Sequence, residues 1–279
     1  MLTNSGMNEL FTAYETILSA RKSEGRTIAI QLGWLYVDTI EIIEKRANSH
    51  LQINIHNKLQ LENWLESNHK IITEITTNPL IQCIDLPWLS ILCKKFEIVL
   101  IVDVTIATTF NVEVLPYCDI AVESLTKFAS GNADLLMGTF VLNEKSKIVQ
   151  ANKKEFHKFI IPAFEGELQR PACQIQNYES RVKKVSENTK TIYDYLNKQS
   201  FVKEIYSVLH HDSVGNFKKI RKSEDSFPGV LSVVFDEDLE FYYDKLQLTK
   251  GPSLGTNSQL QCLMCILHIM NSLKPKQEK

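Results

Sequence analysis

Two segments of the sequence each close an apolar run with residues that could do chemistry. Ile101-Val-Asp-Val-Thr ends one run, and about twenty residues later Ser124-Leu-Thr-Lys ends another. A carboxylate at the tip of a buried strand costs free energy unless it meets a cation or a hydrogen-bond donor. A lysine at the end of the next strand, flanked by hydroxyl residues, would face the same crevice. We therefore expect the carboxylate, the amine and the hydroxyls to share one site.

These are the groups that pyridoxal phosphate requires. A lysine amine forms a Schiff base with the cofactor, a carboxylate keeps the pyridine nitrogen protonated so that the ring withdraws electrons, and hydroxyls hold the phosphate. For either segment alone, the commoner interpretation is a strand-end aspartate that caps a turn and a lysine on the surface. The choice between a cofactor site and an ordinary strand end depends on whether the surrounding helices and strands bring the two segments together.

The first half of the chain alternates helical and strand patterns. Apolar spacing predicts helices over residues 8–20, 38–45, 59–66 and 85–95, and apolar runs predict strands over 27–32, 51–55, 71–75, 96–103, 120–123 and 135–142. Continuous Val/Ile/Leu strands that alternate with helices are typical of an α/β fold with a mainly parallel sheet covered on both faces. Ligands of such sheets bind beyond the carboxyl ends of the strands, where both segments lie.

The second half changes character. Residues 168–196 read as one long charged helix, interrupted near its start by Pro171, and residues 230–235 read as a strand. A turn over 251–257 precedes an apolar stretch, 259–273, that is predicted to be helical. We expect a large domain over 1–170 and a smaller α+β domain over 171–279 that begins with the long connecting helix.

The two segments also carry a family resemblance. Ser124-Leu-Thr-Lys resembles the Ser-x-Thr-Lys signature of the Cys/Met metabolism family of pyridoxal-phosphate-dependent enzymes, and Asp103-Val-Thr stands where that family has Asp-Asn-Thr. The resemblance implies an aspartate-aminotransferase-like fold with a seven-stranded sheet. It also implies a set of roles: Lys127 as the Schiff-base lysine, Asp103 as the partner of the pyridinium, Thr105 in the cofactor site, and Ser124 and Thr126 as phosphate ligands.

Three further segments match the family in the same order. Ser5-Gly6-Met7 opens the first helix, where free N–H groups favour an anion and where the family binds the cofactor phosphate, although a serine that simply caps the helix explains it equally well. By resemblance, Tyr36 is the aromatic ring stacked on the pyridine and takes part in catalysis. Asn78, in Glu74-Ile-Thr-Thr-Asn-Pro, corresponds to the asparagine that contacts the phenolic oxygen, and an ordinary Asn-Pro turn is its alternative.

Two downstream segments, 130–143 and 251–257, are most similar to the fungal cystathionine gamma-synthase branch. This resemblance places Ser253 in the substrate pocket. It implies a transsulfuration enzyme of methionine biosynthesis that joins an O-acylhomoserine to cysteine by gamma-replacement and assembles as a homo-oligomer. A cystathionine lyase or a homoserine sulfhydrylase on the same fold is an alternative.

The chain also departs from the family pattern. Only Met1 to Asn4 precede the Ser-Gly-Met turn, where the family has a phosphate-binding Tyr-x-Arg, and no arginine follows Arg221, where the family has its carboxylate-binding arginine. Val104 and Phe128 replace the asparagine and tyrosine of the wider family. The chain is thus expected to be shortened at both ends. A catalytically impaired paralogue, which only binds cofactor or pairs with a full-length relative, is the second alternative.

Composition excludes other classes of protein. The net charge of −2 predicts no nucleic-acid partner and no anionic membrane surface. No apolar run is long enough to span a bilayer, no signal peptide is visible, and the six cysteines are scattered, which together predict a cytoplasmic protein. Cys262-x-x-Cys265 with His268 is interpreted as part of a buried helix, and His210-His211-Asp212 as a solvated loop, so no metal is predicted.

Overall fold

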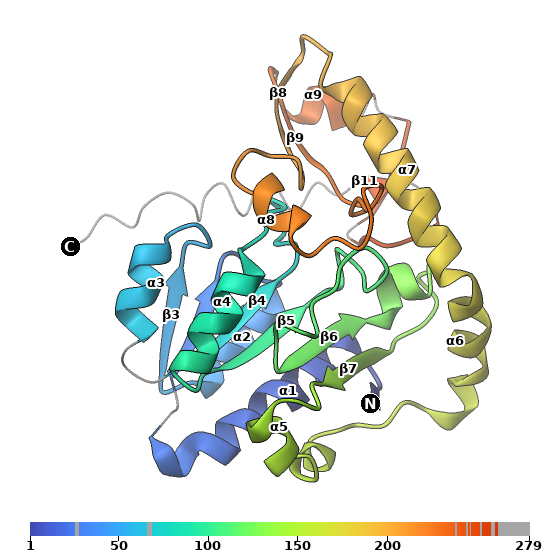
Figure 1. Cartoon of the computed structure of the whole chain (residues 1–279). Coiled ribbons are helices and arrows are strands. Elements are labelled where there is room, and N and C mark those ends of the chain that lie inside the picture. Colours follow the sequence, from blue (N-terminus) through green and yellow to red (C-terminus); the bar gives the residue numbers. More distant parts are fainter. Residues whose placement is uncertain are drawn as a thin grey trace.

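The computed structural model describes residues 1–25, 28–65, 69–237, 239–243, 245, 247–251, 253–257 and 260–261. Its centre is a seven-stranded sheet in the order β1-β7-β6-β5-β4-β2-β3 (Figure 1). The strands are β1 (Leu2–Thr3), β2 (Ile28–Leu32), β3 (Ser49–Ile53), β4 (His69–Glu74), β5 (Val99–Asp103), β6 (Ile120–Ser124) and β7 (Gly138–Leu142). The predicted α/β class is confirmed.

The sheet is mixed, although most of it is parallel. Strands β3, β2, β4, β5 and β6 pair in parallel, β7 runs antiparallel to β6, and β1 runs antiparallel to β7. The apolar runs predicted strand positions but carry no information on direction. Two predicted strands start later than expected, at Val99 and at Gly138, because Phe96 caps the preceding helix and residues 135–137 belong to a loop.

Helices cover both faces of this sheet. Helices α1 (Gly6–Arg21), α2 (Val37–Arg46) and α5 (Lys147–Ala151) lie on one face, and α3 (Lys58–Leu65) and α4 (Leu86–Lys95) on the other (Figure 1). Strand β5 shows how the sequence supports two cores. Val99 and Ile101 pack into the cluster under α1, whereas Leu100 and Val102 pack into the cluster under α4. Alternating side chains of one fully apolar strand thus serve opposite faces.

The long connecting helix is broken, but not where the sequence predicted. Helix α6 (Gln169–Gln174) and helix α7 (Tyr178–Leu196) are joined by a 3₁₀ turn, Ile175–Asn177. Pro171 lies in the first turn of α6, where a missing N–H costs no intrahelical hydrogen bond. Helix α7 covers a third core cluster through Tyr178 and Val182.

Beyond α7, the described residues form two small sheets and the short helices α8 and α9. Strand β8 (Val202–Tyr206) pairs antiparallel with β9 (Ser232–Phe235), and β10 (Thr249–Lys250) pairs parallel with β11 (Leu260–Gln261). Helix α8 is Val214–Lys218 and α9 is Leu239–Tyr243. The predicted helix over 259–273, with its Cys262, Cys265 and His268, lies outside the described residues apart from β11. The predicted domain division at residue 170 stays a prediction.

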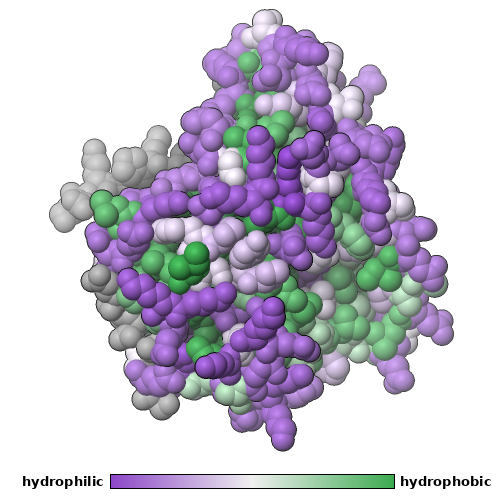
Figure 2. Space-filling model, viewed as in Figure 1, coloured by the Kyte–Doolittle hydropathy of each residue, from purple (hydrophilic) through white to green (hydrophobic). Residues whose placement is uncertain are grey.

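The surface seen in Figure 2 is mainly hydrophilic, with hydrophobic side chains gathered on the side of β7 and α6. Phe164, Ile175 and Leu136 are among the exposed hydrophobic residues of this region. Among the helices of the described residues, none combines the length and the apolar character needed to cross a membrane.

Candidate active site

The predicted site residues meet at the carboxyl edge of the large sheet. Tyr36 follows β2, Asp103 ends β5 and Ser124 ends β6, and because these strands are parallel their ends share one edge. Helix α1 begins at the same edge because β1, which leads into it, runs in the same direction as β6. Gly6 lies directly against Ser124: a Cβ on Gly6 would stand 2.7 Å from Ser124 Oγ. The glycine therefore lets the first turn of α1 approach the end of β6.

Thr105 links the predicted aspartate to the predicted serine. Its N–H donates to Asp103 Oδ1 at 2.8 Å, and its hydroxyl oxygen accepts the N–H of Ser124 at 2.9 Å. Burial raises the pKa of Asp103, and the hydrogen bonds from Thr105 oppose that rise. Thr105 thus fixes the carboxylate at the sheet edge and favours its charged form.

Lys127 lies in a π-helical turn, Leu125–Ala129, that follows β6. Its Nζ donates to Ser253 Oγ at 2.9 Å, so the predicted substrate-pocket serine reaches the predicted lysine from 126 residues away. Gly255 makes this approach possible: its φ is +84°, and a Cβ there would lie 2.6 Å from Phe128 N and 2.8 Å from Lys127 Cα. The 251–257 turn therefore crosses directly over the lysine backbone.

Two predicted phosphate ligands are engaged within the chain. Ser5 Oγ accepts the N–H of Asn8 at 3.2 Å, which is the helix-cap role that the sequence left open. Thr126 Oγ1 accepts the N–H of Met137 at 3.2 Å and lies 3.4 Å from the oxygen of the same residue, which ties the lysine turn to the segment before β7. Phosphate binding by either residue stays a prediction. The first-turn N–H groups of Gly6 and Met7, which have no helical partners, and the Ser124 hydroxyl suit an anion.

Tyr36 and Asn78 lie at the same edge, beyond β2 and β4. The backbone N–H of Tyr36 donates to Glu74 Oε1 at 2.6 Å, while the residue as a whole is 51% exposed. The backbone is thus pinned and the ring is accessible, as a stacking role requires. Asn78 is half-buried four residues beyond the end of β4.

Three buried carboxylic acids surround Asp103, and sequence reasoning gave none of them a role. Burial raises the pKa of Glu9 and of Glu74 well above the usual range, and the charge of Asp103 raises both further. Burial also raises the pKa of Glu123 to about 7, against hydrogen bonds from Tyr178 and Thr109. Because the charge of Asp103 raises the pKa of all three acids, and none of their charges is a cause of the rise at Asp103, we infer that Asp103 carries the negative charge of this edge. Of the three, only Glu123 could have been noticed in the sequence, because it is a charged residue in an otherwise apolar predicted strand.

The residues at this edge fit pyridoxal phosphate. Gly6 leaves a cradle that a Cβ would fill, Asp103 offers a half-buried carboxylate for a ring cation, and Lys127 follows Ser124 by three residues at the same edge. A cavity of about 350 Å³ lies elsewhere, lined by residues that include Asn132, Gln174 and Arg181. None of the predicted site residues lines that cavity, and its amide-rich wall offers no amine for a Schiff base.

The chain matches a family model over almost its whole length. The model describes Cys/Met metabolism PLP-dependent enzymes, and it covers residues 1–278. The chain belongs to this family. Pyridoxal phosphate is therefore its cofactor, and the predicted resemblance is confirmed.

Two curated relatives show how far the similarity reaches. L-2-amino-4-chloropent-4-enoate dechlorinase/desaturase of Streptantibioticus cattleyicolor is 33% identical over 261 residues, which cover 91% of this chain and 52% of that protein. Cystathionine gamma-synthase of Neurospora crassa is 32% identical over 270 residues, which cover 91% of this chain and 43% of that protein. The chain thus spans about half the length of these relatives.

Solved structures show the same fold at lower identity. Cystathionine gamma synthase from Xanthomonas oryzae pv. oryzae, in complex with aminoacrylate and cysteine, matches with a TM-score of 0.80 and 18% identity over 93% of this chain and 68% of its own. A putative O-acetylhomoserine (thiol)-lyase from Campylobacter jejuni, which carries a pyridoxyl-lysine, matches with a TM-score of 0.76 and 20% identity over 89% of this chain and 71% of its own. The predicted fold type is confirmed.

Proposed function

We propose that this cystathionine gamma-synthase-like enzyme joins an O-acylhomoserine to cysteine by gamma-replacement. The observation that carries the proposal is the contact of 2.9 Å between Lys127 Nζ and Ser253 Oγ. It brings the proposed cofactor lysine together with the 251–257 turn, which is one of the two segments that resemble the cystathionine gamma-synthase branch. The substrate would then bind next to the lysine that carries the cofactor.

The side chains of this edge take distinct roles in the proposal. When bound, the cofactor supplies an electron sink for the charge that builds up on the substrate carbon. Asp103 holds a proton on the ring nitrogen, and the Gly6 and Met7 N–H groups with Ser124 bind the phosphate. The ring of Tyr36 covers one face of the pyridine and excludes water from it.

Lys127 is the proton carrier. In its neutral form, the Lys127 amine can act as the general base that takes the alpha proton and then the beta proton of the substrate, and it can return protons later. Ser253 Oγ accepts a hydrogen bond from this amine and so orients its lone pair. The electron pair of the broken beta C–H bond expels the gamma-acyl group as a carboxylate. The sulfur of cysteine then bonds to the gamma carbon as its thiol loses a proton, and protons return to the beta and alpha carbons.

The relatives support a substrate with a leaving group on the gamma carbon. The Neurospora crassa relative is a cystathionine gamma-synthase. The name of the Streptantibioticus cattleyicolor relative describes the loss of chloride from the fourth carbon of an amino acid, which is also its gamma carbon. We therefore keep elimination at the gamma carbon as the second candidate, with replacement by sulfide or cleavage of cystathionine as variants on the same fold.

The test is a product assay on purified protein loaded with pyridoxal phosphate. O-acetyl- or O-succinylhomoserine is supplied with cysteine, and products are identified by mass spectrometry, with Lys127→Ala as the control. Cystathionine that appears only with the wild-type protein supports the proposal. A keto acid that forms without incorporation of cysteine would replace it with gamma-elimination, and cofactor binding without any turnover would replace it with the impaired paralogue.

Assembly and location remain proposals of the same kind. The exposed apolar side chains beside α6, including Phe164 and Ile175, are consistent with a homo-oligomer. Light scattering of the cofactor-loaded protein measures its mass directly. A cytoplasmic location, predicted from the sequence, is tested by fractionating cells that express the full chain.

A further inference from the structure

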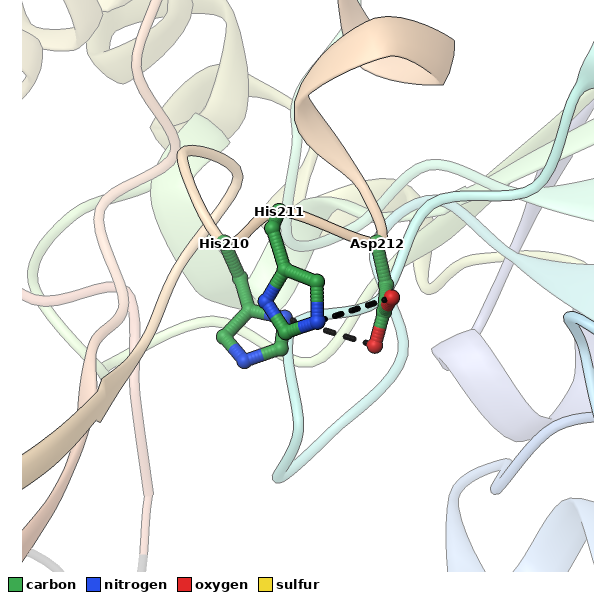
Figure 3. A group of neighbouring side chains, drawn as sticks. All are labelled: His210, His211 and Asp212. Carbon is green, nitrogen blue, oxygen red and sulfur yellow. Dashed lines mark ion pairs between the residues drawn. The ribbon is translucent and has the colours of Figure 1, made fainter.

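The loop between β8 and α8 presents two histidines and an aspartate in succession. The rings of His210 and His211 both turn toward the carboxylate of Asp212 (Figure 3). His211 Nε2 lies 3.1 Å from Asp212 Oδ1, and His210 Nδ1 lies 3.7 Å from Asp212 Oδ2. One ligand atom from each residue can be chosen so that all three lie within 4.8 Å of one another. The loop therefore brings two ring nitrogens and a carboxylate oxygen to one point.

This loop is anchored to the core of the protein. Ser207 and Ser213, which flank the three residues, are fully buried, and Ser213 Oγ accepts the N–H of Cys83 at 3.1 Å. The N–H of His210 donates to Ser207 O at 3.0 Å, and the N–H of Ser213 donates to His210 O at 2.9 Å. A pinned, tightly turned backbone thus imposes the convergence of the three side chains.

The other nitrogen of His210 has a carboxylate partner of its own. Nε2 lies 3.4 Å from Glu204 Oε1, and the hydroxyl of Tyr206 donates to Glu204 Oε2 at 2.6 Å. Only 16% of the His210 side chain is exposed. A histidine that donates from one nitrogen to a carboxylate presents the lone pair of its other nitrogen, which is how proteins orient histidines toward metal ions. In this arrangement the Nδ1 lone pair faces Asp212, and a cation between the two would satisfy both.

We propose that His210 Nδ1, His211 Nε2 and the Asp212 carboxylate bind a divalent transition-metal ion of the zinc type. Imidazole and carboxylate ligands suit such ions, with bonds of about 2.0–2.2 Å. In the tetrahedral geometry of such ions two ligands are about 3.3–3.6 Å apart, so ligand atoms that now lie within 4.8 Å of one another have to approach by up to about 1.5 Å. The side chain of His211 is 81% exposed, which leaves its ring free to make that approach.

His56 follows β3, and its Nε2 is buried and has no hydrogen-bond partner among the described residues, but His56 is not among the residues whose ligand atoms converge. The proposed site therefore has three protein ligands. The metal site shares no residue with the edge that holds Lys127, so it stands or falls independently of the proposed reaction.

Calorimetric titration of zinc into the full chain tests the proposal, after dialysis against EDTA and without added pyridoxal phosphate. We expect one equivalent to bind, and the variant His211→Ala/Asp212→Asn to bind it at least about 10-fold more weakly, with an unchanged far-UV circular dichroism spectrum. Glu204→Gln, which leaves all three ligands in place, is expected to weaken binding by about 10-fold or more. His157→Ala, which removes an exposed histidine elsewhere, should leave the titration unchanged.

The cysteines and histidine at Cys262, Cys265 and His268 could also bind zinc, and cobalt substitution separates the two sources. Thiolate ligands give cobalt an intense near-ultraviolet charge-transfer absorption, whereas imidazole and carboxylate ligands do not. Cobalt bound without that absorption, and lost in His211→Ala/Asp212→Asn, supports the proposal. Binding that is unchanged in this variant, or a wild-type protein that takes up no zinc, overturns it and leaves the three residues as an ion-paired cluster.

Discussion

Strand β4 carries a buried ionisable side chain at each end, and the two ends differ. At the carboxyl end, Glu74 accepts the N–H of Tyr36 at 2.6 Å. At the amino end, Lys70 is 1% exposed and its Nζ has no hydrogen-bond partner among the described residues. A residue beyond β2 supplies the partner of Glu74, whereas no described residue supplies one for Lys70. Burial of a charge alone therefore does not mark the chemical site.

A comparison of Lys70 with Lys127 leads to the same conclusion, that burial alone does not identify the reactive residue. Burial lowers the pKa of Lys70 to about 8, with the charge of Arg21 adding to the effect. By that measure alone, Lys70 would be a reactive amine. It lies under α1, however, with its Nζ 5.8 Å from the centre of the Tyr14 ring. Lys127 has both a hydroxyl partner and a place at the edge where the predicted cofactor ligands meet.

The largest expected effect on cofactor binding and turnover comes from replacing Lys127, with a replacement of Lys70 as its comparison. Lys127→Ala should abolish the visible absorbance of the lysine-bound cofactor and lower turnover by about three orders of magnitude or more, because the attachment point and the proton carrier are lost together. Lys70→Met should retain the band. A band that survives Lys127→Ala and vanishes in Lys70→Met would reverse the assignment.

The next effect concerns the acids at the carboxyl edge. Asp103→Asn should lower kcat/KM by about 100-fold or more, because the ring proton loses its charged partner while the N–H of Thr105 can still donate to the side-chain oxygen. Glu74→Gln is the matched control. Since we infer that Glu74 is neutral, its variant should stay within a few-fold of the wild type. Equal losses in the two variants would contradict a charge held on Asp103 alone.

The buried charge of Lys70 should lower the free energy of unfolding, and replacing Lys70 with an apolar residue should restore it. An unfolded lysine titrates near 10.4, so at pH 7 the folded protein bears the full cost of burying the cation, and the free energy of unfolding rises as pH increases from about 8 to 10.4. Lys70→Met should raise the free energy of unfolding at pH 7 by about 2–3 kcal/mol, with a gain that fades through that window. Urea denaturation at pH 7 and pH 10 measures this. Lys153→Met, at an exposed position, should change neither value.

Glu123 should give stability the opposite dependence on pH, with a smaller change in the free energy of unfolding. Its pKa is raised to about 7, so the folded state binds the proton more tightly than the unfolded state, and stability falls as pH rises from about 4.5 through 7. Glu123→Gln keeps an acceptor for the Tyr178 hydroxyl, and it should add about 1–2 kcal/mol at pH 8 and nothing at pH 4. Denaturation curves at both values test the sign, with the exposed Glu113→Gln as control. A flat wild-type profile would show that Glu123 is not buried in charged form.

The sequence predicted most of the large sheet because its strands are fully apolar. It could not predict that β7 runs antiparallel, since pairing direction depends on the route of the chain and not on local pattern. Strand β8 was missed because Lys203 and Glu204 interrupt its apolar residues, and two of its five positions face solvent. Pro171 was taken for a break because proline fits only the first turn of a helix, and the start of α6 could not be placed from sequence.

The site could be predicted only where motif order implied it. Lys127, Asp103, Ser124 and Gly6 do lie at one edge, as parallel strand ends require. The contact of Thr126 with Met137 and that of Glu9 with the strand pair β6–β7 depend on tertiary packing. The contact of Glu9 depends on Gly138, which lies far from it in the sequence. Gly138 leaves room for the Glu9 carboxylate, because a Cβ at this position would lie 2.4 Å from Glu9 Oε2.

The contact between Lys127 and Ser253 also sets an order of events during synthesis. The strands and the lysine turn of the large sheet lie within the first 142 residues, whereas the serine that caps the lysine is made 126 residues after it. A nascent chain can therefore fold the sheet edge and expose the amine before its cap exists. In the finished protein the amine that receives the cofactor is the one that donates to Ser253 Oγ, so cofactor uptake competes with that hydrogen bond.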